Sequence, residues 1–447
     1  MDFELLKKVI EDECKRLSIS EYEIYYESKS DTSVEMLKNE ISGFTSSSSA
    51  GICLRLVYDG KMGYASSELM DAAEAADLVS RAIGNAKATG KVDTVGIFEG
   101  SKSYDESRLE NNFTPLSTEQ IKEYARAVQS RLYAESDKII DGTQSGVSSG
   151  EREIRIVNSN GLNLSRRVGA SVVMAQAVVS KDGENEADYS VKNITEDLSL
   201  DKMVCETVKT AISKIGAGVA DSGIYPAIIS GKQMRSLLSV YSSVFNARNV
   251  QMGMSLLKGK IGEKIASDCV NITDDPCRTS SSVHFDAEGV ATYRKSVVEN
   301  GVLKTFLHNR ESAMKDGVKS TANASKAGYS SPIGISPYVF CIEAGALSFE
   351  ELCKKADNGV YITEIKGLHA GANAITGDFS LECAGYRIES GTVTSAIKSF
   401  TIAGNFFQLL NKIDSLSDNL QIGVSGGGFT TFGSPDVLVM DASIAGK

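Results

Sequence analysis

The sequence predicts an α+β fold, with two N-terminal units of helix, antiparallel strands and helix, followed by a β-rich domain with a few helices. Three observations predict it. Apolar residues recur at helical spacing over 2–17 and 69–88 and enclose strand-like segments. The same order is repeated after residue 117. Beyond residue 223, strand-like segments and hairpin turns dominate, and antiparallel hairpins combined with helices are typical of α+β proteins.

In the first unit, the strand-like segments are 22–28, 33–44 and 50–66. The last of these contains Asp59-Gly60, a dipeptide that favours a tight hairpin turn. We therefore expect about four strands between the two helices. The segment 92–117 has little periodicity and is expected to connect the two units.

The second unit begins at Ser117, which can form a capping box with Gln120 three residues later. Strands are predicted over 138–150, 151–183 and 184–193, with hairpin turns at Asn160-Gly161 and Asp182-Gly183, before a helix at about 199–215. No residue-level repeat between the two units is evident.

The glycine-containing segment 216–223 marks the start of the C-terminal domain. Helices are predicted near 232–246, 349–357 and 405–413, and strands over 225–230, 290–309, 338–345, 359–365, 377–404 and 436–444. The chain is thus divided into an N-terminal α+β unit (1–90), a central α+β unit (91–220) and a β-rich C-terminal domain (221–447).

Composition excludes several classes of protein. The 47 basic and 58 acidic residues give a net charge of −11, and no Lys/Arg run exceeds two residues, which disfavours direct binding to nucleic acid. No apolar run reaches the length of a membrane span, and the charged N-terminus does not resemble a signal peptide. The eight scattered cysteines are typical of reduced thiols. We therefore expect a cytoplasmic protein that does not insert into membranes.

The glycine-rich segment 423–428 has the sequence GVSGGG. It lacks the Gly-Lys-Ser/Thr of a Walker loop, and the residues that follow are strand-like, so no helix N-terminus is expected to bind a phosphate. Two interpretations remain. The segment could simply connect two strands, or it could form the wall of a cleft where a peptide backbone comes close.

The residues alone do not indicate a catalytic site. The three histidines, His284, His308 and His369, are far apart in the sequence. His284 and His308 flank a predicted hairpin and could meet, although packed side chains are the more common outcome. His369 lies in a glycine-rich bend without a visible partner. No Gly-x-Ser-x-Gly elbow occurs between a predicted strand and a predicted helix.

The segment 367–419 closely resembles the TldD/PmbA family. The matching features are Thr376–Ser380 (TGDFS), Gly385-Tyr386, Ile388–Gly391 (IESG) and Thr401–Asn405 (TIAGN), and the segments 257–276 and 299–313 also fit. The layout of the first 215 residues agrees with the two N-terminal units of the family. The resemblance therefore covers essentially the whole chain.

The resemblance implies a cytosolic metalloprotease built from two related subunits, which degrades or trims flexible peptides. An older label for the family is modulator of DNA gyrase. The metal-binding, TldD-type subunit carries a His-Glu-x-x-x-His helix after the first strand of the C-terminal domain, and a cysteine in a late glycine-rich loop. Here, residues 226–264 contain no histidine and no carboxylate before Glu263, and Ser425 replaces the cysteine. A serine hydroxyl is a poor zinc ligand beside a thiolate. The chain therefore resembles the PmbA (TldE-type) subunit, which lacks the metal motif.

From this resemblance we expect no catalytic residue and no bound cofactor in this chain, with zinc in a TldD-like partner. The expected partners are that TldD-like subunit, in a heterodimer, and/or a second copy of this chain, together with unstructured peptide substrates. Two alternatives remain: a stand-alone homodimeric binding or regulatory protein, and a peptidase with an unrecognised site. The candidate residues of the substrate cleft are Asn373, Ser425, Gly426, Gly427 and Gly428.

Overall fold

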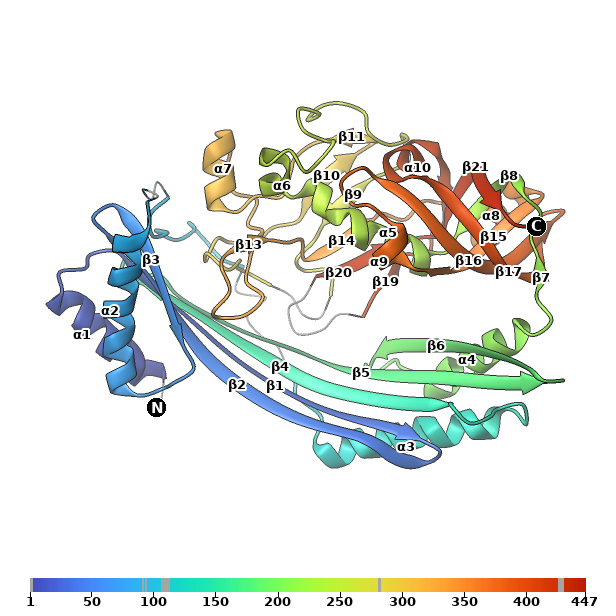
Figure 1. Ribbon diagram of the computed structural model, residues 1–447, viewed down its shortest axis with the longest axis horizontal. Helices are drawn as coiled ribbons and strands as arrows, with labels where there is room; N and C mark the ends of the chain where they lie inside the picture. Colours follow the sequence, from blue (N-terminus) through green and yellow to red (C-terminus); the bar gives the residue numbers. More distant parts are fainter. Residues whose placement is uncertain (1–2, 91, 93–94, 106–112, 280–282, 425–429) are drawn as a thin grey trace.

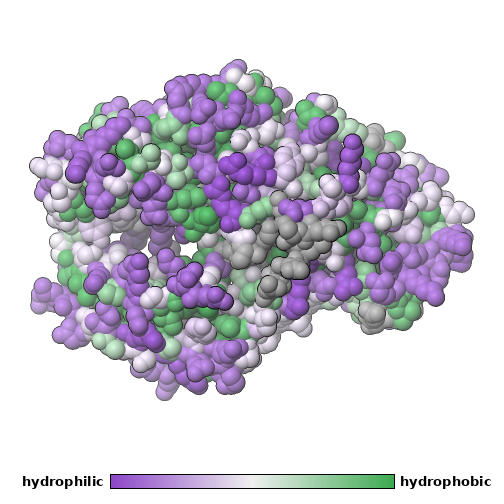
Figure 2. All heavy atoms as spheres, turned by 180° about the vertical axis from the view of Figure 1, so that it is seen from behind, coloured by the Kyte–Doolittle hydropathy of each residue, from purple (hydrophilic) through white to green (hydrophobic). Residues whose placement is uncertain are grey.

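The computed structural model describes residues 3–90, 92, 95–105, 113–279, 283–424 and 430–447 of the chain. The predicted α+β class is confirmed, because long antiparallel strands and helices form the N-terminal half and strands with few helices form the C-terminal half. Figure 1 shows the C-terminal domain above a long curved sheet. On the opposite face, Figure 2 shows a hollow between these two parts of the molecule.

The N-terminal half contains one continuous sheet. Its six strands are antiparallel and follow the order β3-β2-β1-β4-β5-β6. The two predicted units share this sheet, because β1 of the first pairs with β4 of the second. The strands are β1 (Tyr22–Leu37), β2 (Glu40–Tyr58), β3 (Lys61–Ser67), β4 (Gln144–Asn158), β5 (Asn163–Lys181) and β6 (Glu184–Asn193).

The first unit has three strands rather than the predicted four. The predicted strand 33–44 is interrupted by a turn at Lys38 and Asn39, whose φ angles are 53° and 63°. The polar residues 29–32, expected to separate two strands, lie inside the uninterrupted strand β1. The hairpin turn at Asp59-Gly60 is confirmed, as both residues have positive φ.

Four helices cover one face of this sheet in two pairs. They are α1 (Phe3–Arg16), α2 (Ala72–Ala88), α3 (Thr118–Glu135) and α4 (Leu200–Ser213). Apolar side chains of α1 and α2 pack against one part of the sheet, and those of α3 and α4 against the other (Figure 1). The predicted capping box of Ser117 and Gln120 is present at the start of α3.

The other face of the sheet contacts the C-terminal domain. Successive side chains of a strand point to opposite faces, so Ile24 faces the helices whereas Tyr25 packs against Phe285 and Ala287. By the same alternation, charged residues of the strands are directed toward the C-terminal domain. They are Glu23, Glu27, Arg55, Arg152 and Arg166.

The C-terminal domain contains a ring of five strands. In this ring β21 pairs with both β8 and β17, which closes the order β8-β15-β16-β17-β21. The ring strands are β8 (Gly223–Ile229), β15 (Gly359–Lys366), β16 (Asp378–Glu389), β17 (Thr392–Asn405) and β21 (Val437–Ala445), extended by β7 (Gly218–Val219) and β18 (Ile413–Leu416).

A second sheet and several short elements complete this domain. The sheet is formed by β9 (Ile272–Asp274), β10 (Lys295–Glu299), β11 (Val302–Leu303), β14 (Val339–Ile342), β19 (Gln421–Ile422) and β20 (Thr431–Ser434). The short pair is β12 (Ala324–Ser325) and β13 (Gly334–Ile335). The helices are α5 (Gly231–Tyr241), η2 (Ser242–Phe245), α6 (Ala247–Gln251), α7 (Arg310–Asp316), α8 (Phe349–Ala356), α9 (Leu368–Gly371) and α10 (Phe406–Lys412). The sequence did not predict α6, α7 or α9.

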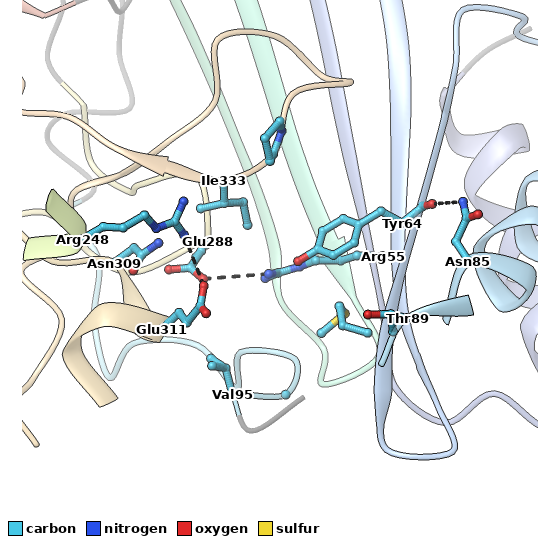
Figure 3. Close-up of a pocket in the computed structure, with 13 residues that line it drawn as sticks. Arg55, Tyr64, Asn85, Thr89, Val95, Arg248, Glu288, Asn309, Glu311 and Ile333 are labelled. Atoms are coloured by element: carbon cyan, nitrogen blue, oxygen red, sulfur yellow. Dashed lines mark hydrogen bonds and ion pairs between the residues drawn. The ribbon is translucent and has the colours of Figure 1, made fainter. Parts of the chain in front are cut away.

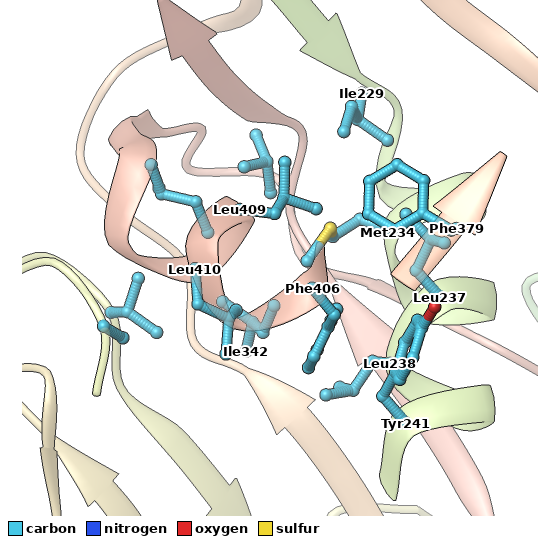
Figure 4. Close-up of a cluster of buried hydrophobic side chains, with 14 of the residues drawn as sticks. Ile229, Met234, Leu237, Leu238, Tyr241, Ile342, Phe379, Phe406, Leu409 and Leu410 are labelled. Atoms are coloured by element: carbon cyan, nitrogen blue, oxygen red, sulfur yellow. The ribbon is translucent and has the colours of Figure 1, made fainter. Parts of the chain in front are cut away.

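The main core of the C-terminal domain lies between α5, α10 and the sheets (Figure 4). Tyr241 of α5 and Phe406 of α10 stack at a ring-centroid distance of 4.3 Å and an interplanar angle of 12°. The Tyr241 hydroxyl donates to the carbonyl oxygen of Asp378 at 3.0 Å. The apolar face of α5 is therefore used for packing.

The segment 95–105 joins the two halves. Asn158 of the N-terminal sheet donates to the carbonyl oxygen of Phe98 at 2.8 Å. Tyr104 donates to the carbonyl oxygen of Gly289 in the C-terminal domain at 2.7 Å. Because it is held from both sides, this segment fixes part of the contact between sheet and domain. Within the described ranges, no helix combines the length and apolarity needed to span a membrane.

Candidate functional site

Among the cavities that described residues of both the N-terminal half and the C-terminal domain line, two are well above the others in volume. The larger, which we call the basic cavity, has a volume of about 610 Å³. The second, which we call the mixed-charge cavity, has a volume of about 500 Å³. They adjoin, because Arg248 and Pro332 line both. Cavities of this size at a domain interface are common ligand sites.

The basic cavity is formed by both halves of the chain. From the sheet, β1, β4 and β5 contribute Tyr25, Arg152 and Arg166. From the C-terminal domain come the residues around β12 and β13, the start of α6 and Thr430: Asn246, Arg248, Ala287, Ala324, Ser325, Lys326, Ala327, Ser331, Pro332, Gly334, Ile335, Ser336, Pro337, Tyr338 and Thr430. Four of these described lining residues are cationic and none is acidic.

Arg152 anchors the two halves to each other. Its Nη2 atom lies 2.8 Å from a carboxylate oxygen of Glu27 on β1. The same nitrogen donates to the carbonyl oxygen of Lys326, in the C-terminal domain, at 3.2 Å. Both charged side chains are buried, so the ion pair is shielded from water and holds the wall of the cavity in place.

Arg166 and Lys326 have a different environment. Within the described residues, neither lies within ion-pair distance of a carboxylate. Arg166 donates to the carbonyl oxygen of Phe285 at 2.7 Å and stands over the Phe285 ring. Lys326 places Nζ 4.7 Å from the centre of the Tyr25 ring. Burial lowers the pKa of both cations, since removal from water disfavours the charged form.

Two hydrogen-bond donors of this wall are also unused. Within the described part of the chain, Nε of Arg166 and the hydroxyl of Tyr338 are buried without a hydrogen-bond partner. Burial, followed by the charge of Asp286, raises the pKa of Tyr338 well above its usual value. The hydroxyl is therefore protonated at neutral pH and can donate.

The mixed-charge cavity contains matched charges (Figure 3). Arg55 lies 3.9 Å from Glu288. Its guanidinium also lies 2.8 Å from Glu23 of β1. Arg248 lies 3.2 Å from Glu311. Its cations thus have carboxylate partners, which distinguishes this cavity from the side of the basic cavity formed by Arg166 and Lys326.

The predicted cleft residues are only partly described. Ser425, Gly426, Gly427 and Gly428 lie outside the described residues. Asn373 is exposed and follows α9, where its side-chain oxygen accepts hydrogen bonds from the backbone of residues 375 and 376, at 2.9 and 3.2 Å. It is absent from the described lining of both cavities, so its observed contacts are those of a local turn.

The histidines lie on separate elements. His284 is buried against the edge of Phe285, and His308 is buried with Nδ1 3.3 Å from the Ser312 hydroxyl. His369 is exposed on α9. Across the ranges that the structure describes, no group of three or more His, Cys, Asp or Glu side chains is placed to hold a metal ion.

Helix α5 lies directly after β8, the first strand of the C-terminal domain. This is the place where the family resemblance implied the metal-binding helix. The 11 residues of α5, GKQMRSLLSVY, include no histidine and no carboxylate. Gln233 uses its amide to join α5 to β15, donating to the carbonyl oxygen of Thr363 at 2.7 Å and accepting from the backbone of Ile365 at 3.2 Å.

Sequence reasoning missed the cationic residues of the interface. Arg152, Arg166 and Lys326 lie on distant segments, and each is flanked by residues ordinary for an exposed strand or loop. One signal was available. In β4, the side chains of Arg152, Ile154 and Ile156 lie on the same face of the strand, and both isoleucines are buried. The alternation of side chains along a strand therefore predicts that Arg152 faces a covered surface.

Comparison with known proteins agrees with this architecture. The chain matches PmbA/TldA metallopeptidase domain 1 over residues 22–86, the central domain over 111–215 and the C-terminal domain over 222–446. It is 26% identical to a metalloprotease of Methanothermobacter thermautotrophicus over 93% of each chain. It is 25% identical to the metalloprotease PmbA of Escherichia coli O157:H7, over 87% of this chain and 85% of that protein.

A solved structure shares the same fold. A Thermotoga maritima protein, described as a candidate modulator of a DNA gyrase, superposes with a TM-score of 0.88 and 29% identity, over 99% of this chain and 100% of its own. The resemblance of segment 367–419 is confirmed by the match of the C-terminal domain. With matches to all three domains, this chain belongs to the PmbA/TldD family of metallopeptidases.

Proposed function

We propose that this chain is the non-metal subunit of a heteromeric PmbA/TldD-type metalloprotease and that it binds unstructured peptides at the interface of sheet and C-terminal domain. The observation that carries the proposal is the composition of α5. The polar side chains of the helix that follows β8 are those of Lys, Gln, Arg, Ser and Tyr, and none of these is a usual zinc ligand.

The packing of α5 supports the same proposal. Its buried face, with Leu237, Leu238 and Tyr241, belongs to the main core. Gln233 is held by two hydrogen bonds to β15. The helix therefore has a structural role that does not need a metal. Ser425 stands where the metal-binding subunit has a cysteine, and a serine there agrees with the proposal of a non-metal subunit.

Catalysis in this proposal takes place in a TldD-like partner. There, a zinc ion would activate water and polarise the scissile carbonyl. This chain would supply binding surface: its two adjoining cavities, of about 610 and 500 Å³, lie between the two halves of the chain. We propose a heterodimer with the partner, with a homodimer as a second assembly, in the cytoplasm.

The test is a titration of activity. The TldD-like protein of the same genome is held at fixed concentration, and hydrolysis of an unstructured peptide is followed as this chain is added. We expect the rate to rise above that of the partner alone and to saturate at equimolar chain. A control uses the partner with the glutamate of its His-Glu-x-x-x-His motif replaced by glutamine, which should remain inactive throughout. A rate that does not change with added chain contradicts the proposal.

A further inference from the structure

We propose that the basic cavity is a carboxylate-binding site, in which Arg166 and Lys326 hold the carboxylate of a peptide. The identification of the ligand as a peptide rests on the proposed function. The preference for a carboxylate rests on the cavity itself, and the two can be tested separately.

The charge of the cavity lining favours an anionic ligand. Four cations and no described carboxylate line the cavity. Arg152 is paired with Glu27 and Arg248 with Glu311, which leaves Arg166 and Lys326 without ion-pair partners in the described residues. Removing a cation from water is unfavourable unless a negative charge approaches it. An anionic ligand would provide that charge to both.

Buried hydrogen-bond donors in the cavity wall also favour a carboxylate. Nε of Arg166 and the hydroxyl of Tyr338 are buried donors without partners among the described residues, and both side chains line the cavity. A carboxylate has only acceptors, about four lone-pair sites on two oxygens, so it complements a site with surplus donors. Guanidinium groups bind carboxylates especially well, because two parallel hydrogen bonds can form.

The apolar part of the cavity lining favours an organic acid. Small or apolar side chains stand beside the cations: Ala287, Ala324, Ala327, Pro332, Ile335 and Pro337. Such a surface can contact the carbon atoms of an organic acid, which a bare inorganic ion lacks. A peptide carboxylate is attached to such carbon atoms. It can come from the C-terminus or from an Asp or Glu side chain.

The position of the cavity agrees with a role in peptide binding. Thr430, the first described residue after the glycine-rich segment, lines the cavity and donates to the carbonyl oxygen of Pro337 at 2.7 Å. In the sequence, Thr430 follows the glycine-rich segment that the family resemblance associates with the peptidase cleft. A carboxylate held here would fix one point of an extended peptide.

The experiment compares three fluorescent peptides of the same Gly/Ser/Ala sequence by anisotropy on the full chain. One has a free C-terminal carboxylate, one has a C-terminal amide, and one has the amide with a single internal glutamate. We expect the amide without glutamate to bind about tenfold more weakly than at least one acidic form, as for loss of a hydrogen bond to a charged group. The acidic form that binds identifies the source of the carboxylate. Equal affinities of all three overturn the proposal.

Substitutions of Arg166 and Lys326 test whether the preference for a carboxylate arises in the basic cavity. Arg166→Gln and Lys326→Met should each reduce the tenfold preference to about twofold or less, whereas Arg166→Lys, which keeps the charge, should preserve part of it. The matched control is Lys304→Gln, a cation outside the cavity lining. Circular dichroism verifies folding, and the three-peptide comparison on the unmodified chain decides the matter if a variant does not fold. An unchanged preference in folded Arg166→Gln and Lys326→Met contradicts the assignment.

The two proposals fail differently. If the activity titration shows no enhancement but the carboxylate preference is present, the proposed function is wrong and the site remains. If activity is enhanced and the three peptides bind equally, the carboxylate site is wrong and the subunit role remains.

Discussion

Arg55 on β2 extends across the interface to within 3.9 Å of Glu288 in the C-terminal domain. Both side chains are buried, with exposed fractions of 6% and 3%. Glu23, on the neighbouring strand β1, lies 2.8 Å from the same guanidinium. One arginine thus compensates two buried carboxylates, one from each half of the chain, and this links the stability of the interface to that of the sheet.

Replacing Arg55 should lower the stability of the folded chain. Arg55→Gln leaves Glu23 and Glu288 buried without their shared cation, so we expect the free energy of unfolding to fall by about 3–5 kcal/mol. Urea unfolding followed by circular dichroism measures it. The control, Lys122→Gln, removes an exposed partner of Glu119 and should cost less than about 1 kcal/mol. Equal losses in the two variants would show that the buried cluster contributes little.

The stacked pair Tyr241 and Phe406 gives a prediction for the core. Phe406→Ala removes a fully buried ring and should destabilise the chain by about 3–5 kcal/mol. Phe44→Ala changes the same residue types at a position on β2 that is 52% exposed, and should change stability by about 0.5 kcal/mol or less. Thermal unfolding of the two variants side by side checks the difference. Similar melting temperatures would contradict the position of Phe406 in the core.

Replacing either of two glycines by alanine should change the stability of the chain, in opposite directions at the two positions. A Cβ on Gly385, in the matched Gly-Tyr pair of β16, would clash with the carbonyl oxygen of Tyr361. Gly385→Ala should therefore destabilise by about 1–3 kcal/mol. Gly84, inside α2, has open space around its Cβ position, and Gly84→Ala should stabilise by about 0.5–1 kcal/mol. Unfolding midpoints measure both, and a neutral Gly385→Ala would show that β15 can move away.

Binding of the carboxylate peptide should depend on pH through Lys326. Burial lowers the pKa of Lys326; the charge of Arg55 acts in the same direction, while Cys53 and Glu23 oppose it. The ammonium form attracts the carboxylate, and it is lost as the pH rises through this lowered pKa. We therefore expect affinity to decline with rising pH at lower pH than for an ordinary lysine, whose pKa is about 10.4. Anisotropy titrations measure the profile. In Lys326→Met, and for the amide peptide, this decline should be absent.

Much of the local structure could be predicted, since it is encoded in short segments. The capping box of Ser117 starts α3 where expected, α8 starts at the predicted residue 349, and Asp59-Gly60 turns between β2 and β3. The turn at Lys38-Asn39 was missed because Lys is rare at positive φ. The fusion of two units into one sheet was missed because the pairing of β1 with β4 joins segments about 120 residues apart, as in Ser30 with Glu151.

The site was less predictable than the fold. Absence of metal ligands from α5 could be read directly, because the resemblance specified both the helix and its place after β8. The basic cavity could not, because Arg152, Arg166 and Lys326 meet only when the sheet and the C-terminal domain are in contact. Strand alternation assigns Arg152 to a covered face, but it does not say what covers that face.

The most direct test of the account is the zinc content and peptidase activity of this chain purified alone, compared with the equimolar mixture with its TldD-like partner. We predict that the dialysed chain retains less than about a tenth of an equivalent of zinc and is inactive, since α5 offers no zinc ligand. The mixture should exceed the activity of the partner alone. Stoichiometric zinc together with peptide hydrolysis by the isolated chain would contradict the account and would place a metal site elsewhere in the molecule.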